Sequence, residues 1–159
     1  MSRRSITALR FQDLAVGDEW ESPARTITQA DVAAFAGLSG DYNPLHMDHE
    51  AAAAGPFGAP VAHGLLGLAV SSGLASNAPR VETLAFLCVI RWEFLRPIRF
   101  NDTVHVLTRV EALESRARGR RGLVTWRRQV IDQAGQVLQD GTIQTLVRGR
   151  DAVEPESGE

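Results

Sequence analysis

The chain has 159 residues, of which 44% are hydrophobic. This length allows one domain with a substantial core and is short for two. The net charge of −2 supplies no excess of positive charge for binding nucleic acid or an acidic membrane surface. The sequence therefore predicts neither of these partners.

Cysteine content and apolar segments bear on the compartment. Cys88 is the single cysteine and cannot form an internal disulfide, which fits a reducing compartment. The first residues lack the apolar stretch of a signal peptide. The longest apolar segment, 65–74, is much shorter than the ~20 residues of a membrane span. We therefore expect a cytoplasmic protein without a membrane segment.

The first predicted elements are a strand and a helix. Residues 18–28, DEWESPARTIT, favour a short strand that Pro23 interrupts. Thr28 has the position of a helix N-cap, and Asp31 places an acidic group in the first turn. Apolar residues follow at helical spacing, and Gly40 is a suitable C-terminal stop.

Two further helices are predicted before the strands. Asp48 can cap a short helix through HEAAAA, which the segment GPFGAP at 55–60 terminates. Residues 61–79 contain no Asp, Glu, Lys or Arg and are apolar or small on every face. This pattern indicates a helix that is buried all round rather than one lying on the surface.

Beyond Pro79 the sequence favours strands, because β-branched and aromatic residues alternate with polar ones between turn signals. The predicted segments are 83–98, 102–115, 122–133 and 136–149. With the early strand they make a curved antiparallel sheet of about five strands, wrapped around a long buried central helix. The helix's other side would be covered by more chain or by another subunit. This α+β arrangement is a hot-dog fold. We assign it to residues 1–150 as a single domain, and expect the acidic tail 151–159 to be disordered.

The segment SGDYNPLHMDHE, residues 39–50, places Asp41 and His46 on either side of Pro44. On a continuous helix these two side chains would be separated by about 140°. Pro44 disfavours helix at Asn43, so DYNPLH should form a turn that can bring Asp41 and His46 together. Such a pair can take a proton from water and deliver one to carbon. The alternative is a capping Asp and a surface His joined within the turn.

A larger pattern surrounds this pair. FAGLSGDYNPLHMD, followed by HGLLGLAVSSGL, resembles the MaoC-like dehydratases and (R)-specific enoyl-CoA hydratases over about residues 25–74. The resemblance implies one hot-dog domain that forms a homodimer or a higher assembly of dimers. It also implies that the protein is a hydro-lyase of fatty acid metabolism. Such an enzyme reversibly hydrates trans-2-enoyl-CoA to (R)-3-hydroxyacyl-CoA.

The same resemblance implies roles for individual residues. Asp41 and His46 match the catalytic pair that holds and activates the water. The backbone amide of Gly64 matches the donor to the thioester oxygen, and Ser72 matches a serine that lines this site. These matches make chemical sense, because charge developing on the thioester oxygen needs a preorganised donor and a helix N-terminus supplies one.

Asn43 and Pro44 belong to the motif and are interpreted as shaping the turn. No cofactor is predicted, and the CoA thioester enters as a substrate: conjugation already makes C3 electrophilic, so an acid, a base and an oxyanion donor suffice. No metal is predicted either, because His46 and His49 lack a third ligand at a recognisable spacing. His63 is interpreted as orienting the start of the central helix, with a chemical role as the alternative.

Two other functions remain open on the sequence alone. One is an acyl-CoA thioesterase of the same fold, since fold does not fix chemistry. The other is a noncatalytic acyl-thioester-binding protein. The Asp, Asn-Pro, His motif favours the hydratase. The sequence does not determine the length or branching of the acyl chain, or whether CoA or acyl-carrier protein carries the thioester. It also does not decide between Arg96 and Arg99 as contacts for the CoA phosphates.

Overall fold

The strand-rich second half of the chain forms one antiparallel sheet. A computed structural model describes residues 8–150 and pairs four long strands in the order β4-β5-β6-β3. Their bounds confirm the predicted segments to within a few residues: β3 (Thr83–Phe94), β4 (Thr103–Arg116), β5 (Arg121–Ile131) and β6 (Val137–Arg148). The predicted disordered tail, 151–159, lies outside the described residues.

The early strand is divided at the predicted proline. β1 (Glu19–Glu21) and β2 (Arg25–Thr26) both pair antiparallel with β4, and Pro23 lies between them. Because proline has no amide hydrogen to donate, it interrupts the ladder at that point. Within residues 8–150 the sheet therefore has six strands, because the predicted early strand is divided in two.

The helix that precedes the motif begins and ends as predicted. The Thr28 side chain accepts a hydrogen bond from the Asp31 amide, and the Asp31 carboxylate accepts one from the Thr28 amide. Gly40 ends the helix in the left-handed conformation, with φ of 78°. The first half of the chain contains η1 (Phe11–Asp13), α1 (Gln29–Ser39), α2 (Pro44–Met47) and α3 (His49–Ala53); η2 (Ala117–Gly119) joins β4 to β5.

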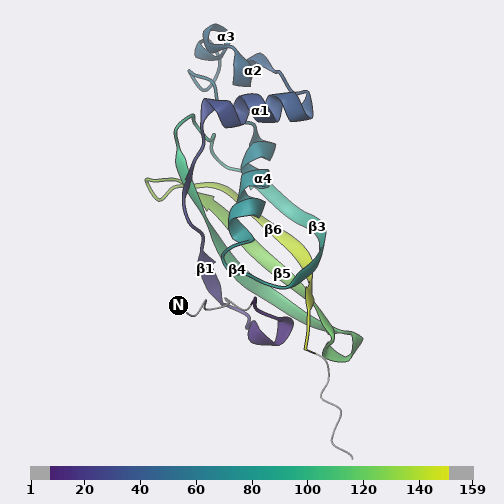
Figure 1. Ribbon diagram of the computed structural model, residues 1–159. Coiled ribbons are helices and arrows are strands. Elements are labelled where there is room, and N and C mark those ends of the chain that lie inside the picture. The colour runs from purple at the N-terminus through teal and green to yellow at the C-terminus, as the bar shows by residue number, and fades with distance from the viewer. Residues whose placement is uncertain (1–7, 151–159) are drawn as a thin grey trace, which may run out of the picture.

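The central helix α4 (Gly64–Ala75) crosses one face of the sheet, while α1, α2 and α3 gather at one end of it (Figure 1). One side of α4 faces the sheet through Leu66, Gly67, Val70, Ser71 and Ala75, which are buried. The opposite side, formed by Leu65, Ala69, Ser72 and Gly73, is exposed among the described residues. Burial of this helix on all sides would therefore require a further covering element.

A close approach fixes α4 on the sheet. Gln139 of β6 is fully buried, and its side-chain amide donates to the Gly64 carbonyl at 3.0 Å. Its side-chain carbonyl accepts from the Trp92 indole at 3.1 Å. A Cβ atom at Gly67 would lie 2.3 Å from the Gln139 Nε2 atom, so only glycine allows this contact.

The outer face of the sheet carries a charged pair that should make stability depend on pH. The Asp140 carboxylate accepts two hydrogen bonds from Arg127, at 2.6 and 3.1 Å, and one from Gln129 at 2.9 Å. The hydrogen bond from Arg127 lowers the pKa of Asp140. Because the folded-state pKa is depressed, this stabilisation is present above the unfolded pKa of roughly 3.9 and is lost as the pH falls through the folded value.

We expect Asp140→Asn to lower the free energy of unfolding at pH 7 by about 1 kcal/mol or somewhat more, since Arg127 remains partly solvated. Urea unfolding of both proteins at pH 7 and again near pH 3 would measure this. The difference between them should shrink at low pH. A difference that is the same at both pH values would contradict the prediction.

No helix within residues 8–150 is both long and apolar enough to cross a membrane.

Candidate active site

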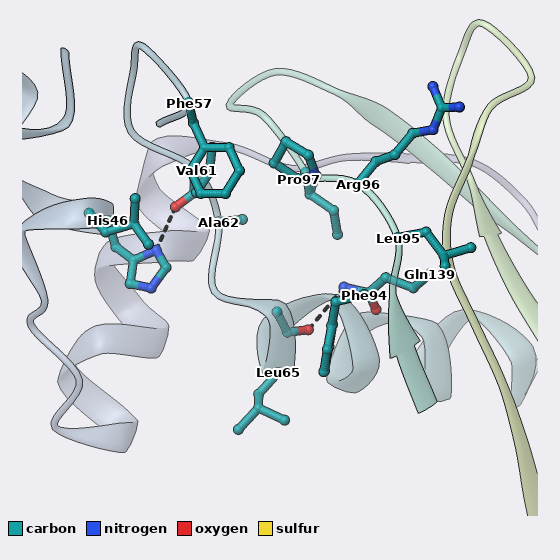
Figure 2. A pocket seen from close by; sticks show the side chains of 13 residues that line it. His46, Phe57, Val61, Ala62, Leu65, Phe94, Leu95, Arg96, Pro97 and Gln139 are labelled. Carbon is teal, nitrogen blue, oxygen red and sulfur yellow. Dashed lines mark hydrogen bonds between the residues drawn. The ribbon is translucent and has the colours of Figure 1, made fainter. Parts of the chain in front are cut away.

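A cavity of about 450 Å³ opens beside the N-terminal end of α4 (Figure 2). Its walls are mainly apolar and include Leu45, Val61, Leu65, Phe94, Pro97 and Ile98. Its polar lining comes from three side chains, those of His46, Arg96 and Gln139, and from the backbone of Gly64. The cavity thus combines an apolar surface with a few polar groups, as small-molecule sites do.

The motif loop that carries His46 differs in form from the predicted turn. Pro44 is the first residue of α2, and Asn43 caps this helix by accepting a hydrogen bond from the Leu45 amide at 2.9 Å. The prediction of a turn through His46 is therefore wrong in its second half. The reason is that proline suits the first helical position, where its missing amide hydrogen has no helical partner to lose.

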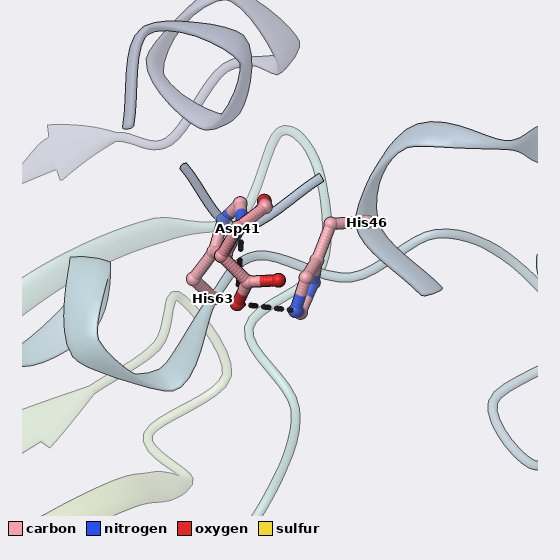
Figure 3. Close-up of side chains that lie close together, drawn as sticks. All are labelled: Asp41, His46 and His63. Carbon is pink, nitrogen blue, oxygen red and sulfur yellow. Dashed lines mark hydrogen bonds and ion pairs between the residues drawn. The ribbon is translucent and has the colours of Figure 1, made fainter. Parts of the chain in front are cut away.

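The structure brings Asp41 and His46 together and adds a third group (Figure 3). The Asp41 Oδ2 atom lies 4.0 Å from His46 Nε2 and 3.9 Å from His63 Nε2. The two imidazole rings stack with their centroids 3.8 Å apart. His63 directly precedes α4, so the site joins the motif loop to the start of the central helix.

The hydrogen bonds of His46 determine its tautomer. His46 Nδ1 lies 2.7 Å from the carbonyl oxygen of Val61, which can only accept (Figure 2). Nδ1 therefore carries the proton in the neutral ring, and Nε2 presents a lone pair toward Asp41. His46 is thus oriented as a base whose free nitrogen faces a carboxylate.

Asp41 is held by its own loop. Its Oδ1 atom accepts a hydrogen bond from the Asn43 amide at 3.2 Å. Its Oδ2 atom faces the two histidine rings. The side chain is 52% exposed, so this carboxylate is open to solvent and to a ligand.

His63 acts on Asp41 through the backbone. The buried His63 ring lies with Nε2 2.9 Å from the Asp41 carbonyl oxygen, so Nε2 is the donor. Its Nδ1 atom is buried without a hydrogen-bond partner among residues 8–150. His63 therefore positions Asp41 by holding its backbone, and its ring lies beside the reactive pair. The His63 side chain makes no capping hydrogen bond to α4, so the predicted role in orienting the start of this helix stays a prediction.

Asp41, His46 and His63 also have the composition of a metal site, since their candidate ligand atoms lie within 4.8 Å of one another. The hydrogen bond made by His63 argues against metal binding by this group. The His63 Nε2 atom carries the proton that it donates to Asp41, and a protonated nitrogen cannot ligate. The absence of a metal and of a cofactor stays a prediction.

Gly64 is the first residue of α4, where an amide has no partner within the helix. It lines the same cavity as His46. A Cβ atom at this position would come within 2.9 Å of the Phe94 ring, so a larger residue would have to displace this half-exposed side chain. The amide lies at the positive end of the helix dipole and can stabilise an oxyanion.

Comparison with known proteins defines the family. Residues 11–134 match the MaoC like domain family. The chain belongs to this family. An (R)-specific enoyl-CoA hydratase of Rhodospirillum rubrum is 30% identical over 151 residues, which cover 94% of this chain and 99% of that protein. A 3-hydroxybutyryl-CoA dehydratase of Methylorubrum extorquens is 36% identical over 118 residues, covering 72% of this chain and 73% of that protein.

The MaoC-like domain also resembles solved structures. The MaoC-like dehydratase from Rhodospirillum rubrum has a TM-score of 0.77 and 31% identity, covering 91% of this chain and 99% of that one. The fold and the hydratase and dehydratase relationship are thereby confirmed. Some relatives are much longer: this chain covers only 29% of Protein MaoC of Klebsiella aerogenes, where identity is 36% over 96 residues, or 60% of this chain.

Ser72 does not join the other predicted residues of this MaoC-like domain. It is exposed on α4 eight residues beyond Gly64, and it lines a second cavity at the other end of the helix. At about 1.5 Å per residue, the two positions are about 12 Å apart along the helix axis. Within one chain, Ser72 therefore lines a different cavity from His46 and Gly64.

Sequence reasoning missed Gln139 and the contact of His63 with Asp41. The only sequence signal for Gln139 is a long polar side chain in a predicted strand. His63 and Asp41 are far apart in the chain, and no local pattern predicts their contact.

Proposed function

We propose that this MaoC-like domain catalyses reversible addition of water to a trans-2-enoyl-CoA, giving the (R)-3-hydroxyacyl-CoA. The observation that carries the proposal is the separation of 4.0 Å between Asp41 Oδ2 and His46 Nε2. Two acceptors at this distance can both hold one water molecule. His46 also lines the cavity that reaches the first amide of α4. The names of two relatives, an (R)-specific enoyl-CoA hydratase and a 3-hydroxybutyryl-CoA dehydratase, support the same reaction.

The groups at the site can balance this reaction. The water oxygen bonds to C3, and one water proton passes to the Asp41–His46 pair. The π electrons move toward the thioester oxygen, where the Gly64 amide donates a hydrogen bond. The pair then returns the proton to C2, so the protein ends in its starting state and one water has been added. Losing such an oxyanion donor typically costs about 2.7–4 kcal/mol of transition-state stabilisation.

Crotonyl-CoA tests the proposal directly. We expect loss of the conjugated enoyl absorbance without release of free thiol, and chiral analysis should give the (R) product. Thiol release would instead indicate a thioesterase and overturn the proposal. An (S) product would contradict the stereochemical assignment alone. A cytoplasmic location also stays a prediction of the sequence.

Arg96 is the better placed of the two candidate contacts for the CoA phosphates. Arg96 lines the cavity, and its guanidinium donates to the exposed side chain of Gln136 (Figure 2). Arg99 is not part of the cavity lining and donates to the Phe57 carbonyl at 3.3 Å. We expect Arg96→Ala to raise KM for crotonyl-CoA roughly three- to tenfold through loss of a charge-assisted contact.

Two controls isolate this effect. Arg116→Ala removes an exposed arginine at the far end of β4 and should leave KM unchanged. Crotonyl-pantetheine lacks the nucleotide phosphates, so the substitution at Arg96 should not affect its KM. An equal rise in KM for both thioesters would contradict a phosphate contact.

We propose further that the active unit is a homodimer joined through β3. This strand is an edge of the sheet, and it is exposed along almost its whole length. Its exposed large apolar side chains are Leu84, Phe86, Leu87, Val89, Ile90 and Phe94. An unpaired apolar edge favours pairing with another strand. Pairing of two copies of β3 would extend the sheet and cover the exposed side of α4.

A further inference from the structure

Arg128 interrupts the apolar inner face of β5. Val124, Trp126 and Val130 point to the core and are buried, and Arg128 occupies the same alternating position. Its Nε atom is buried without a hydrogen-bond partner within residues 8–150. Such a group is destabilising unless it meets an anion.

The charge on Arg128 persists despite its burial. Desolvation lowers the pKa of Arg128 to about 10, and no carboxylate among the described residues counters this shift. The guanidinium is therefore still protonated near neutral pH. Arg127, its neighbour, points to the opposite face and is paired with Asp140. The inward-facing Arg128 is thus a cation without an anionic partner among residues 8–150.

Arg128 lines a second cavity, of about 310 Å³, at the C-terminal end of α4. Thr108 Oγ1, in the same cavity, is also buried without a partner among residues 8–150. Thr145 Oγ1 accepts from the Trp126 indole at 2.8 Å, which leaves its own proton available to donate. Within residues 8–150, one cation and two hydroxyls thus lack acceptors. The other walls include the apolar side chains of Ala75, Pro79, Val81 and Phe86.

The two cavities lie at opposite ends of the same pair of elements. The first is bordered by Gly64 of α4 and Phe94 of β3. The second is bordered by Ser72 of α4 and Phe86 of β3. Between them, Ala69 of α4 and much of β3 are exposed. Uncharged surface on α4 therefore leads from the site of the thioester toward Arg128, and in the proposed dimer this surface would lie between the two subunits.

We infer that the cavity around Arg128 binds a carboxylate at the far end of the acyl chain, so that the preferred substrates are 2-enoyl thioesters of dicarboxylic acids. A guanidinium matches the two oxygens of a carboxylate, and the one charged side chain in the cavity lining matches a single negative charge. The threonine hydroxyls would donate to the same oxygens. This inference rests on the proposed hydratase function and specifies its substrate class.

Matched substrates test the inference on the unaltered protein. Three series of trans-2-enoyl-CoA thioesters, ending in a methyl, a hydroxyl or a carboxylate, would be compared over a range of chain lengths. At the best length, we expect kcat/KM for the carboxylate to exceed that for the methyl compound roughly 10- to 100-fold, as a buried charge-assisted contact allows. The hydroxyl compound should gain much less.

Variants then assign the preference to this cavity. Arg128→Met should abolish the ratio of carboxylate to methyl kcat/KM, and Thr108→Val should reduce it severalfold. Arg109→Met, on the exposed face of β4, is the matched control and should keep the full ratio. Arg128→Met should also unfold at the same or a higher temperature, because it removes an unpaired buried charge.

The outcomes separate this inference from the proposed function. Hydration of the methyl series without a carboxylate preference would overturn the inference and leave the hydratase proposal intact. Equal preference for hydroxyl and carboxylate, or a preference that survives Arg128→Met, would also overturn it. If no thioester of any series is hydrated, the proposed function itself fails.

Discussion

Replacing Asp41 with Asn is expected to reduce kcat for crotonyl-CoA hydration by roughly 10² to 10⁴, the range typical of a lost acid–base group. The side-chain carbonyl of the substituted residue can still accept a hydrogen bond from the Asn43 backbone amide, as Asp41 Oδ1 does at 3.2 Å. The loop should therefore keep its form. However, the oxygen or nitrogen that replaces Asp41 Oδ2 beside His46 carries no negative charge. The substituted side chain can therefore no longer act as an anionic acceptor for the shared water. Binding of acyl-CoA should therefore persist, and steady-state kinetics together with calorimetric titration would separate the two effects.

The matched control is Asp48→Asn. Asp48 lies in the same segment but only caps α3, accepting hydrogen bonds from the amides of Glu50 and Ala51 at 2.9 and 3.0 Å. Asn caps a helix nearly as well as Asp, so this variant should keep its kcat.

If Asp41 and His46 hold one water, Asp41→Asn and His46→Asn combined should lose little more activity than either alone. Near-normal turnover by Asp41→Asn would rule out its catalytic role.

Replacing Ile90 with Lys is expected to weaken the proposed dimer at least about 100-fold, because a buried, unpaired charge costs several kcal/mol. Ile90 lies on the apolar edge strand β3 and is 55% exposed in the single chain. In a two-fold interface the substitution occurs twice, which doubles its effect. Sedimentation velocity over a range of concentrations would measure the change from dimer to monomer.

Val16→Lys provides the comparison for Ile90→Lys. Val16 is 63% exposed and precedes β1, which lies at the opposite edge of the sheet from β3. It should leave the association state unchanged. A wild-type protein that stays monomeric at micromolar concentration would contradict the proposed dimer, as would an Ile90→Lys variant that remains dimeric.

Local sequence signals predicted much of the fold because their causes are local. The Thr28 cap acts within the first turn of α1, and Pro23 interrupts the ladder at its own position. Alternation of apolar and polar residues likewise marks β4 to β6, because side chains of a strand point to opposite faces. The proline of the motif was harder, since the same residue can break one helix or begin another. Its effect depended on Asn43, which caps α2.

The candidate site was predictable only in part. The motif identified Asp41 and His46, but their separation along the chain does not determine the distance between their side chains. The stacking of His63 on His46 depends on how α4 meets the motif loop. Ser72 was assigned to the same site by resemblance, yet it lies in the second cavity within the single chain. Arg128 was not predicted at all: it interrupts the apolar alternation of β5, but its lack of a partner among the described residues depends on contacts between strands.

The sequence by itself therefore determined the order of the strands and helices, the helix caps and the acid and imidazole of the motif, because each depends on residues close together in the chain. The tertiary structure alone decided which nitrogen of His46 faces Asp41 and that His63 holds the Asp41 backbone. It also decided that Arg128 lines a cavity beside α4 without a partner in the described part of the chain. These features arise from contacts between distant segments, and the directions of those contacts are set by how α4 packs on the sheet.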